Sequence, residues 1–328
     1  MLIRRRRGWE LPESASTPEA LVVGRRRLLG AGLAGAASIG LGGFTFGGPR
    51  QLPDFAEGDP SLPLYPVARS MRYRVEREIT QADVVYTHNN FYEFGSSKAV
   101  WQAAQKLALR PWEIRIDGMV EQERVVDIDE ILKALPLEER VYRHRCVEAW
   151  AMTVPWSGIP MRAFVEWCKP LASAKYVRME TFNKPEVATG IRQAPWYPWP
   201  YIEGLTIDEA TNELALIGTG IYGKPLPKQM GAPIRLVVPW KYGFKSVKSV
   251  VRFSFTDQRP KSFWETIQGS EYGFWANVNP KVPHPRWSQA TEELIGTGGS
   301  RVPTQLYNGY GEFVAELYKS RESEKLWM

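Results

Sequence analysis

Aromatic residues and prolines place the tightest constraint on how this chain can fold. The 328 residues include 13 tryptophans, 14 tyrosines, 13 phenylalanines and 25 prolines. Aromatic side chains favour pleated, half-buried surfaces, and proline interrupts helices because it has no backbone N–H to donate. The composition therefore favours strands and rigid loops over a bundle of long helices. The length is sufficient for a substantial core in one large domain or two.

The net charge of +6 is concentrated at the N-terminus. Residues 1–48 contain seven arginines and three glutamates, a local charge of about +4 that leaves about +2 for the rest of the chain. Basicity confined to a leader does not create a phosphate-binding surface on the folded protein. A nucleic-acid partner is therefore not expected.

Residues 1–48 are predicted to be a twin-arginine export signal. Arg25, Arg26 and Arg27 precede a weakly apolar segment, rich in glycine and alanine, that runs to Gly48. Paired arginines before such a segment are typical of this export route, and Ala36-Ala37-Ser38 is one possible cleavage context. We therefore expect the twin-arginine translocation machinery as a partner and the periplasm as the destination. The alternative is an uncleaved anchor, although so many glycines make a poor membrane helix.

The rest of the chain is predicted to fold as a single α+β domain over residues 81–328, preceded by an extended, proline-rich arm over 49–80. Periodicity and turn signals predict strands at the start of 84–95, in 112–120, after 124, and over 175–182, 233–240 and 246–255. Helices are predicted over 97–108, before Pro136, over 161–171 and near 312–319.

Cys146 is the residue that suggests chemistry most directly. It lies in "YRHRCVEAW", with Arg143 and Arg145 before it and Glu148 after it. Positive neighbours lower the pKa of a thiol and favour the thiolate, which binds soft metals and attacks electrophiles. The local chemistry thus predicts a reactive thiolate that is a candidate metal ligand.

Two other roles for Cys146 stay open on the sequence alone. A disulfide with Cys168 suits an exported protein, but Cys168 falls on the apolar face of the helix predicted over 161–171, where cysteine packs as a small hydrophobe. A catalytic dyad with His144 has little support because residues two apart on a strand share a face without being in hydrogen-bond register. The three histidines show no zinc spacing.

Two further segments have alternative interpretations. "GTGIYG" (218–223) matches G-x-G-x-x-G, but the prolines that follow exclude a dinucleotide-binding helix, so a glycine-rich turn is expected. "KYGFKSVKSV" (241–250) has the composition to present backbone N–H groups and lysines to an anion. Local composition alone favours a surface hairpin with solvated lysines.

Several long motifs together resemble one family. They are "NNFYEFG" (89–95), "RCVEAWAMTVPWSG" (145–158), "YGKPLPKQMGAPIRLVVPWKYGFKSVKS" (222–249), "EYGFWANVNP" (271–280) and "HPRWSQATEELIG" (284–296). These segments resemble the catalytic subunits of the periplasmic protein-methionine-sulfoxide reductases, molybdopterin enzymes of the sulfite-oxidase-like fold. The resemblance covers the leader and the chain from about Tyr86 onward.

The resemblance implies one Mo-molybdopterin per chain, with Cys146 as the catalytic residue and the single protein ligand to molybdenum. It implies that the residues around the cofactor are Asn89, Tyr92, Glu93, Cys146, Thr181, Arg235, Ser246, Val247 and Lys248. Met230 departs from the family pattern, because relatives have an asparagine that contacts the cofactor there. Arg145, Glu148, Trp150 and Trp156 are candidates for positioning substrate or for plain packing.

The resemblance also implies a function. The enzyme would reduce methionine sulfoxide in oxidised periplasmic proteins by oxygen-atom transfer to molybdenum. Its electrons would come from a heme-binding membrane subunit and the quinone pool, because the chain has no C-x-x-C-H heme motif. The alternatives are oxidation of sulfite on the same cofactor, and a non-catalytic exported binding module that uses its many aromatic residues.

Overall fold

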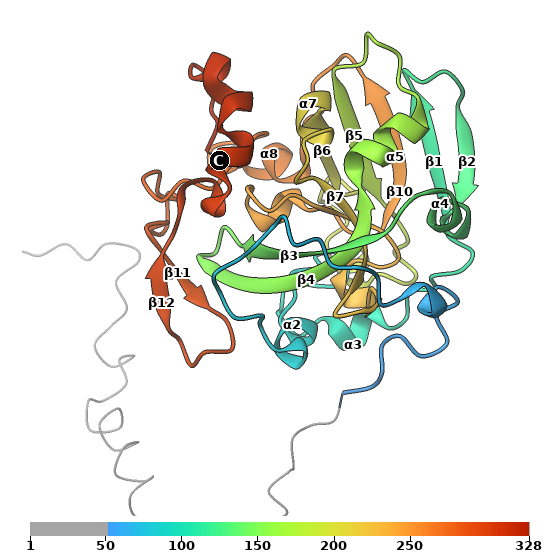
Figure 1. Cartoon of the computed structure of the whole chain (residues 1–328), viewed down its shortest axis with the longest axis horizontal. Coiled ribbons are helices and arrows are strands. Elements are labelled where there is room, and N and C mark those ends of the chain that lie inside the picture. The colour runs from blue at the N-terminus through green and yellow to red at the C-terminus, as the bar shows by residue number, and fades with distance from the viewer. Residues whose placement is uncertain (1–51, 328) are drawn as a thin grey trace, which may run out of the picture. The chain divides into compact units, whose positions relative to one another are not determined.

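The computed structural model describes residues 52–327, in which two β-sheets are surrounded by short helices (Figure 1). The predicted α+β class is confirmed. The predicted export signal over 1–48 lies outside the described residues. No helix within 52–327 has the length and apolar character that crossing a membrane requires.

The first sheet has five strands in the order β2-β1-β10-β5-β6. Only the β1–β10 pair is parallel. The strands are β1 (Glu113–Gly118), β2 (Arg124–Asp127), β5 (Tyr176–Thr181), β6 (Ile202–Thr206) and β10 (Val250–Thr256).

The second sheet has seven strands, with the path β12-β11-β4-β7-β8 and with β3 and β9 pairing with β4 and β7. Its centre is β4 (Trp150–Pro160), in which every residue from Trp150 to Ile159 is buried. The other strands are β3 (Glu138–Arg145), β7 (Leu216–Ile221), β8 (Lys224–Pro225), β9 (Arg235–Val237), β11 (Thr291–Leu294) and β12 (Arg301–Pro303).

The helices are short and join or cover the strands. The α-helices are α2 (Ala82–Thr87), α3 (Trp101–Ala104), α4 (Ile128–Ala134), α5 (Met161–Cys168), α6 (Thr189–Gln193), α7 (Ile207–Ala210), α8 (Phe263–Gln268) and α9 (Gly311–Val314). The 3-10 helices are η2 (Leu62–Leu64), η3 (Lys228–Met230), η4 (Gly243–Lys245), η5 (Leu306–Gly309) and η6 (Ala315–Arg321).

Local signals explain the elements that the sequence predicted well. In β1 the isoleucines at 114 and 116 are buried and Glu113 and Arg115 are exposed, the alternation of a half-buried strand, which ends at the buried Asp117. The Asp127 side chain caps α4 by accepting a hydrogen bond from the Asp129 N–H at 2.8 Å.

Cys168 is buried on the apolar face of α5, and both cysteines of the chain are free thiols. The predicted helix face is confirmed, and the disulfide alternative is wrong.

Two local predictions are wrong. The residues "VVYT" after Asp83 were expected to begin a strand, but they form most of α2, so tertiary packing overrides the β-propensity of the valines. The 218–223 motif is mainly strand β7, and only Tyr222 and Gly223 make the turn into β8, both with positive φ. The motif leads into β8 and does not open a helix.

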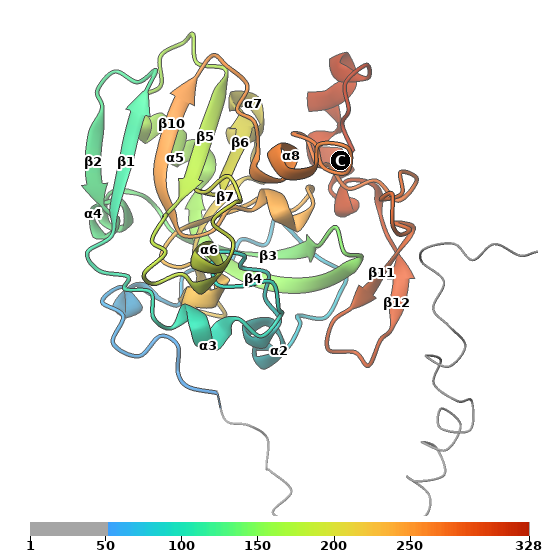
Figure 2. The same ribbon diagram turned by 180° about the vertical axis from the view of Figure 1, so that it is seen from behind.

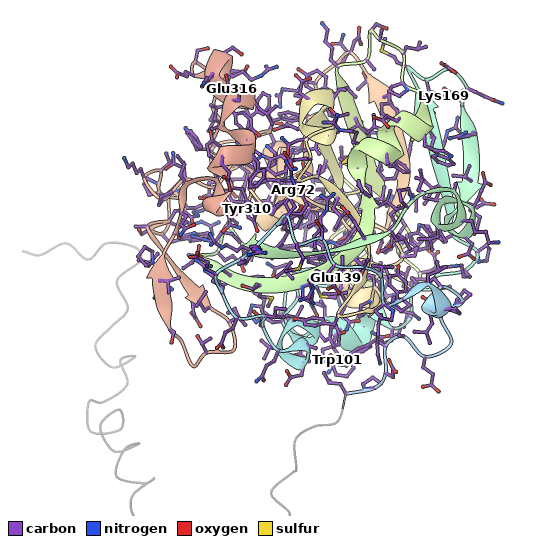
Figure 3. The ribbon with its side chains drawn as sticks, viewed as in Figure 1. Arg72, Trp101, Glu139, Lys169, Tyr310 and Glu316 are labelled. Carbon is purple, nitrogen blue, oxygen red and sulfur yellow. The ribbon has the colours of Figure 1, made fainter. Side chains whose placement is uncertain are left out.

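The segment that precedes α2 runs along the second sheet rather than standing alone. Arg69 pairs with Glu139 of β3 in a parallel bridge, and the Arg69 guanidinium forms a salt bridge with the Glu139 carboxylate at 2.5 Å. Glu139 is labelled in Figure 3. Tyr65 adds a hydrogen bond from its hydroxyl to the Thr219 carbonyl at 2.9 Å. Residues 52–80 therefore contribute to the packing of the sheet that carries Cys146.

The lysines of the 241–250 segment contradict the solvated-hairpin interpretation. Lys241 is fully buried and pairs with Glu209 at 2.5 Å. Lys245 is fully buried and pairs with Glu203 at 2.6 Å. The Tyr318 hydroxyl also donates to Glu209, at 2.6 Å. These pairs connect the segment before β10 to β6, α7 and the C-terminal helix η6.

We predict that Lys241→Met lowers the free energy of unfolding by about 3–5 kcal/mol, because it leaves the Glu209 carboxylate buried without its cation. The double variant Lys241→Met/Glu209→Leu should recover part of that loss. Urea denaturation measures both. As a control, Lys319→Met removes the exposed pair with Glu316 and should change stability by less than about 1 kcal/mol. Equal effects of Lys241→Met and Lys319→Met would contradict the prediction.

Candidate active site

One cavity of about 620 Å³ adjoins the Cys146 thiol. Its walls come from five stretches of the chain that are far apart in sequence: 88–93, 144–156, 197–201, 230–248 and 264–287. The cavity has three distinct parts: the hairpin that carries Cys146, a group of cationic side chains, and a wall of aromatic rings.

Cys146 lies in the tight turn between β3 and β4. The Cys146 N–H donates to the Trp150 carbonyl at 2.9 Å, and the Ala149 N–H donates to the Cys146 carbonyl at 3.1 Å. Ala149 has a φ of 65°, a conformation that a non-glycine residue adopts only when its surroundings require it. The turn also aims the Glu148 N–H at the Cys146 sulfur, 3.5 Å away. The backbone thus presents the sulfur to the cavity in one orientation.

Arg145 holds this turn from behind. Its side chain is fully buried and does not line the cavity. The guanidinium pairs with the Glu292 carboxylate at 2.8 Å and donates to the Cys146 carbonyl and to Gln289. Glu292 also pairs with Arg77 at 2.5 Å. Of the roles considered for Arg145, the geometry supports positioning of the cysteine and not contact with substrate.

Burial outweighs the effect of the positive neighbours on the Cys146 thiol. Burial raises the pKa of Cys146 to about 12, the Glu148 carboxylate adds to the increase, and Lys98 and Arg145 oppose it only in part. Arg143 points away, because its guanidinium bonds Gln305 and the Asn308 carbonyl. The predicted low-pKa thiolate is therefore wrong for the protein alone. Coordination of a metal would have to displace the thiol proton.

Glu148 is fixed beside the sulfur by three donors. Its Oε2 atom accepts from Lys98 at 2.5 Å, from the Trp150 indole at 2.8 Å and from Asn90 at 3.3 Å. Oε2 lies 3.7 Å from the Cys146 sulfur. Lys98 and its neighbours hold the pKa of Glu148 below its usual value despite the burial. A carboxylate is thus held in place next to the candidate metal ligand.

Arg235 and Lys248 bring positive charge to the cavity, where Glu93 is the carboxyl that acts on Lys248. Burial raises the pKa of Glu93, which makes it a poor counterion. Within residues 52–327 neither side chain forms a salt bridge, and Lys248 Nζ makes no hydrogen bond. Arg235 donates to the carbonyls of Met230 and Ser246 and lies over the Trp156 ring. Burial lowers the pKa of Arg235 to about 9, and burial with the nearby Arg235 lowers that of Lys248 to about 7.

His144 lies beside these cations as a neutral group. Burial, Arg235 and Lys248 together lower the pKa of His144 to about 3. A Cβ on Gly243 would lie 2.7 Å from its Nε2 atom, so the glycine is needed for this close approach. The predicted cysteine–histidine dyad has no support, since no hydrogen bond joins His144 to Cys146 in the described part of the chain.

Unsatisfied polar atoms surround the same cavity. His88 Nε2, Asn89 Oδ1 and Trp156 Nε1 are buried and have no hydrogen-bond partner among the described residues. Buried polar atoms are normally bonded, so orphans that cluster at one site need an explanation. A large, polar, anionic ligand with a phosphate and several ring heteroatoms fits both the orphaned atoms and the unpaired cations. The residues present thus fit a molybdopterin.

Eight of the nine residues that the sequence predicted line this cavity: Asn89, Tyr92, Glu93, Cys146, Arg235, Ser246, Val247 and Lys248. Thr181 is buried but is not among the lining residues, and its hydroxyl donates to the Phe182 carbonyl at 3.3 Å. Met230 also lines the cavity, and its sulfur accepts a hydrogen bond from the Asn89 amide at 3.1 Å. The thioether therefore engages one of the predicted cofactor residues, although it cannot donate a hydrogen bond as asparagine does.

The aromatic wall was not predicted from the sequence. Trp150 and Trp156 were considered, but the cavity is also lined by Tyr197, Tyr201, Trp264, Tyr272 and Trp287. These rings come from loops after α6 and around α8 that have no periodicity. In the sequence, the only indication of this wall is the high number of aromatic residues, and that number does not predict where they lie.

Protein side chains alone do not form a metal site here. Among residues 52–327, no group of three histidine, cysteine, aspartate or glutamate side chains converges in a way that could hold an ion. A metal bound at Cys146 would need most of its ligands from a cofactor.

Comparisons with known proteins agree with this description. A family model described as "Oxidoreductase molybdopterin binding domain" matches residues 101–264, half of the chain. The protein-methionine-sulfoxide reductase catalytic subunit MsrP of Burkholderia mallei is 44% identical over 322 residues, covering 97% of this chain and 96% of that protein. MsrP of Xanthomonas axonopodis pv. citri is 44% identical over 325 residues, covering 96% and 97%.

Among solved structures, the sulfane dehydrogenase SoxCD from Paracoccus pantotrophus is similar with a TM-score of 0.46 and 16% identity. The match covers 87% of this chain and 70% of that one.

We predict that Arg145→Lys loosens the Cys146 turn, because lysine cannot reproduce the guanidinium contacts to Glu292, Gln289 and the Cys146 carbonyl. In a Cys168→Ala background, the Cys146 thiol of the cofactor-free protein should react several-fold faster with a maleimide. The free energy of unfolding should fall by about 1–3 kcal/mol. The control is Arg143→Lys, whose guanidinium faces Gln305. Unchanged thiol reactivity in Arg145→Lys would refute the positioning role.

A second prediction concerns the unpaired charge of Lys248. Lys248→Met should stabilise the cofactor-free protein, raising its Tm by about 2–4 °C for each kcal/mol recovered, because it removes a half-buried amine that forms no salt bridge among the described residues. The same variant should bind less pterin, measured by pterin fluorescence after release. Lys224→Met, which removes an exposed lysine paired with Asp54, is the matched control. Lower stability of cofactor-free Lys248→Met would contradict the argument.

Proposed function

The chain belongs to the family of protein-methionine-sulfoxide reductase catalytic subunits, which are molybdopterin-binding oxidoreductases, and from this premise we propose that it reduces methionine sulfoxide in oxidised proteins to methionine. The observation that carries the proposal is the combination of a cavity-facing Cys146 with unpaired Arg235 and Lys248 in one chamber. The predicted oxidoreductase class and molybdopterin-binding domain are confirmed. The individual residue roles stay predictions.

The proposed roles follow from position. Cys146 would be the single protein ligand to the metal, one per chain, and Arg235 with Lys248 would neutralise the phosphate of the pterin. Asn89 and His88 offer unbonded polar atoms to the same ligand. When bound, the cofactor supplies a molybdenum centre that takes up the sulfoxide oxygen and exchanges electrons.

The chain's own residues would orient the substrate and exclude water. The S-methyl and methylene groups of a methionine sulfoxide side chain can pack against aromatic faces, and Trp264, Tyr272 and Trp287 offer such faces along the wall. Glu148 is held rigidly beside the sulfur of Cys146, so the carboxylate and the metal ligand keep a constant separation. A preorganised site needs little rearrangement when substrate binds.

Charge distribution favours a neutral sulfoxide over sulfite. Sulfite is a dianion near neutral pH and needs converging arginines, whereas the only arginines that line this cavity, within the described residues, are Arg235 and Arg286. Arg286 is already paired with Glu271 at 2.7 Å. Arg235 lies with Lys248, where the phosphate is proposed to bind.

The electron donor and the location belong to the same proposal. We infer that a heme-binding membrane subunit, drawing on the quinone pool, supplies the electrons, and that the enzyme works in the periplasm on oxidised proteins. The relatives are named catalytic subunits, which supports a partner of this kind. The leader with Arg25, Arg26 and Arg27 supports export by the twin-arginine route.

Expression in a host that makes the cofactor, followed by metal analysis and electron paramagnetic resonance, tests the proposal. We expect molybdenum and pterin in equal amounts, turnover of methionine sulfoxide with a reduced viologen dye, and little oxidation of sulfite. Cys146→Ser should lower turnover more than about 100-fold, since even outer contacts of metal ligands change activity 10- to 100-fold. Cys168→Ser is the control. Full activity of Cys146→Ser, or protein without molybdenum, would overturn the proposal.

A further inference from the structure

The loop that follows α6 places a tryptophan in solvent directly beside the cavity. Trp196 is 74% exposed, the largest fraction among the exposed large hydrophobic residues of 52–327. Its neighbour Tyr197 lines the cavity. The two rings lie 6.1 Å apart in an edge-on arrangement. A single exposed apolar side chain is ordinary on a protein surface. Trp196 differs because it lies next to a cavity-lining residue, at the rim of the chamber.

The loop is held rigidly although its surface is exposed. The Tyr197 N–H donates to the Ala194 carbonyl at 3.1 Å, and the Trp199 indole donates to the same carbonyl at 2.9 Å. Trp199 packs on Phe263 with ring centres 4.9 Å apart. The backbone next to Trp196 is therefore held in place, so binding there would cost little backbone ordering entropy.

The base of the loop is attached to the predicted cofactor residues. The N–H groups of Gly190 and Ile191, in α6, donate to the Glu93 carbonyl at 2.8 and 3.1 Å. A Cβ on Gly190 would lie 2.1 Å from the Tyr92 carbonyl oxygen, so only glycine permits this approach. Figure 2 shows α6 on the side of the molecule that faces the viewer. These contacts of Gly190 and Ile191 hold the start of the loop that leads to Trp196 against the wall of the cavity.

Aromatic rings continue from this loop around the cavity. Tyr197 contacts Phe263 at 6.0 Å, Phe263 contacts Trp264 at 5.7 Å, and Trp264 contacts Tyr272 at 5.2 Å between ring centres. The wall that would hold a methionine sulfoxide side chain and the exposed Trp196 thus form one surface. A free amino acid fills only the inner part of it, whereas a polypeptide must also lie across the rim.

We infer that Trp196 and Tyr197 form a docking surface for the polypeptide backbone and side chains that flank a methionine sulfoxide in a protein substrate. This inference rests on the proposed function and extends it to substrate selection. The flat indole stacks on side chains and peptide groups of many kinds, so it suits substrates of varied sequence. Its N–H makes no hydrogen bond within the described chain, so it is free to donate to a peptide carbonyl.

The test compares two substrates with a reduced viologen dye as the electron source, so that docking of a donor subunit plays no part. One substrate is free methionine sulfoxide, and the other is a blocked synthetic peptide with one methionine sulfoxide at its centre. For Trp196→Ala we expect KM for the peptide to rise about three- to tenfold. Both kcat values, and KM for the free amino acid, should stay as in the parent, and Trp196→Phe should restore most of the loss.

The control is Met71→Ala, which removes another exposed apolar side chain (63% exposed) that does not line the cavity, and which should leave both KM values unchanged. Equal KM values for the peptide in the parent and Trp196→Ala would overturn the inference. If the peptide KM is unchanged, a separate assay with the donor subunit as the electron source, slower for Trp196→Ala, would assign the surface to that subunit. If the parent reduces neither substrate, the proposed function itself fails.

Discussion

The buried pair between Arg145 and Glu292 is the interaction on which the candidate active site depends. Both side chains are fully buried, and Glu292 also receives Arg77. The pair therefore joins the arm before α2, the β3–β4 hairpin and strand β11 at one point. Removing one partner of such a pair leaves an uncompensated charge and costs about 3–5 kcal/mol. Because Arg145 also bonds the Cys146 carbonyl, the stability of this junction and the position of the cysteine are physically linked.

Within residues 235–248, two lysines form salt bridges with buried carboxylates, whereas Arg235 and Lys248 form none among the described residues. Lys241 and Lys245 are buried and neutralised by carboxylates from α7 and β6, so they serve the fold. Lys248 and Arg235 face the cavity and form no salt bridge among the described residues, and the carboxyl that acts on Lys248, Glu93, has a pKa raised by burial. A protein that can neutralise two neighbouring lysines has no structural need to leave a third without a partner. The missing anion is most simply supplied by a ligand, and the phosphate of a pterin meets that requirement.

The sequence predicted the residues of the cavity better than its shape. Strand β1 and helix α4 are predicted correctly. Apolar residues alternate along β1, and α4 ends just before a proline. The central strand β4 is buried on both faces, so it has no alternation to detect. Eight residues that line the cavity were predicted only through long motifs of a known family, since no local rule connects Asn89 to Lys248. The thiol of Cys146 was misjudged because sequence neighbours such as Arg143 point elsewhere in space.

The two sides of the cavity divide binding between different kinds of chemistry. The part formed by Arg235, Lys248 and the unbonded atoms of Asn89 and His88 suits a charged, hydrogen-bonding group that stays bound. The wall formed by Trp264 and Tyr272 suits the apolar part of a methionine sulfoxide side chain, which would bind and leave in each catalytic cycle. Aromatic contacts are weak individually and tolerant of sequence, whereas buried ion pairs are strong and specific. Retention of a cofactor together with release of varied products therefore follows from where charge and aromatic surface lie around Cys146.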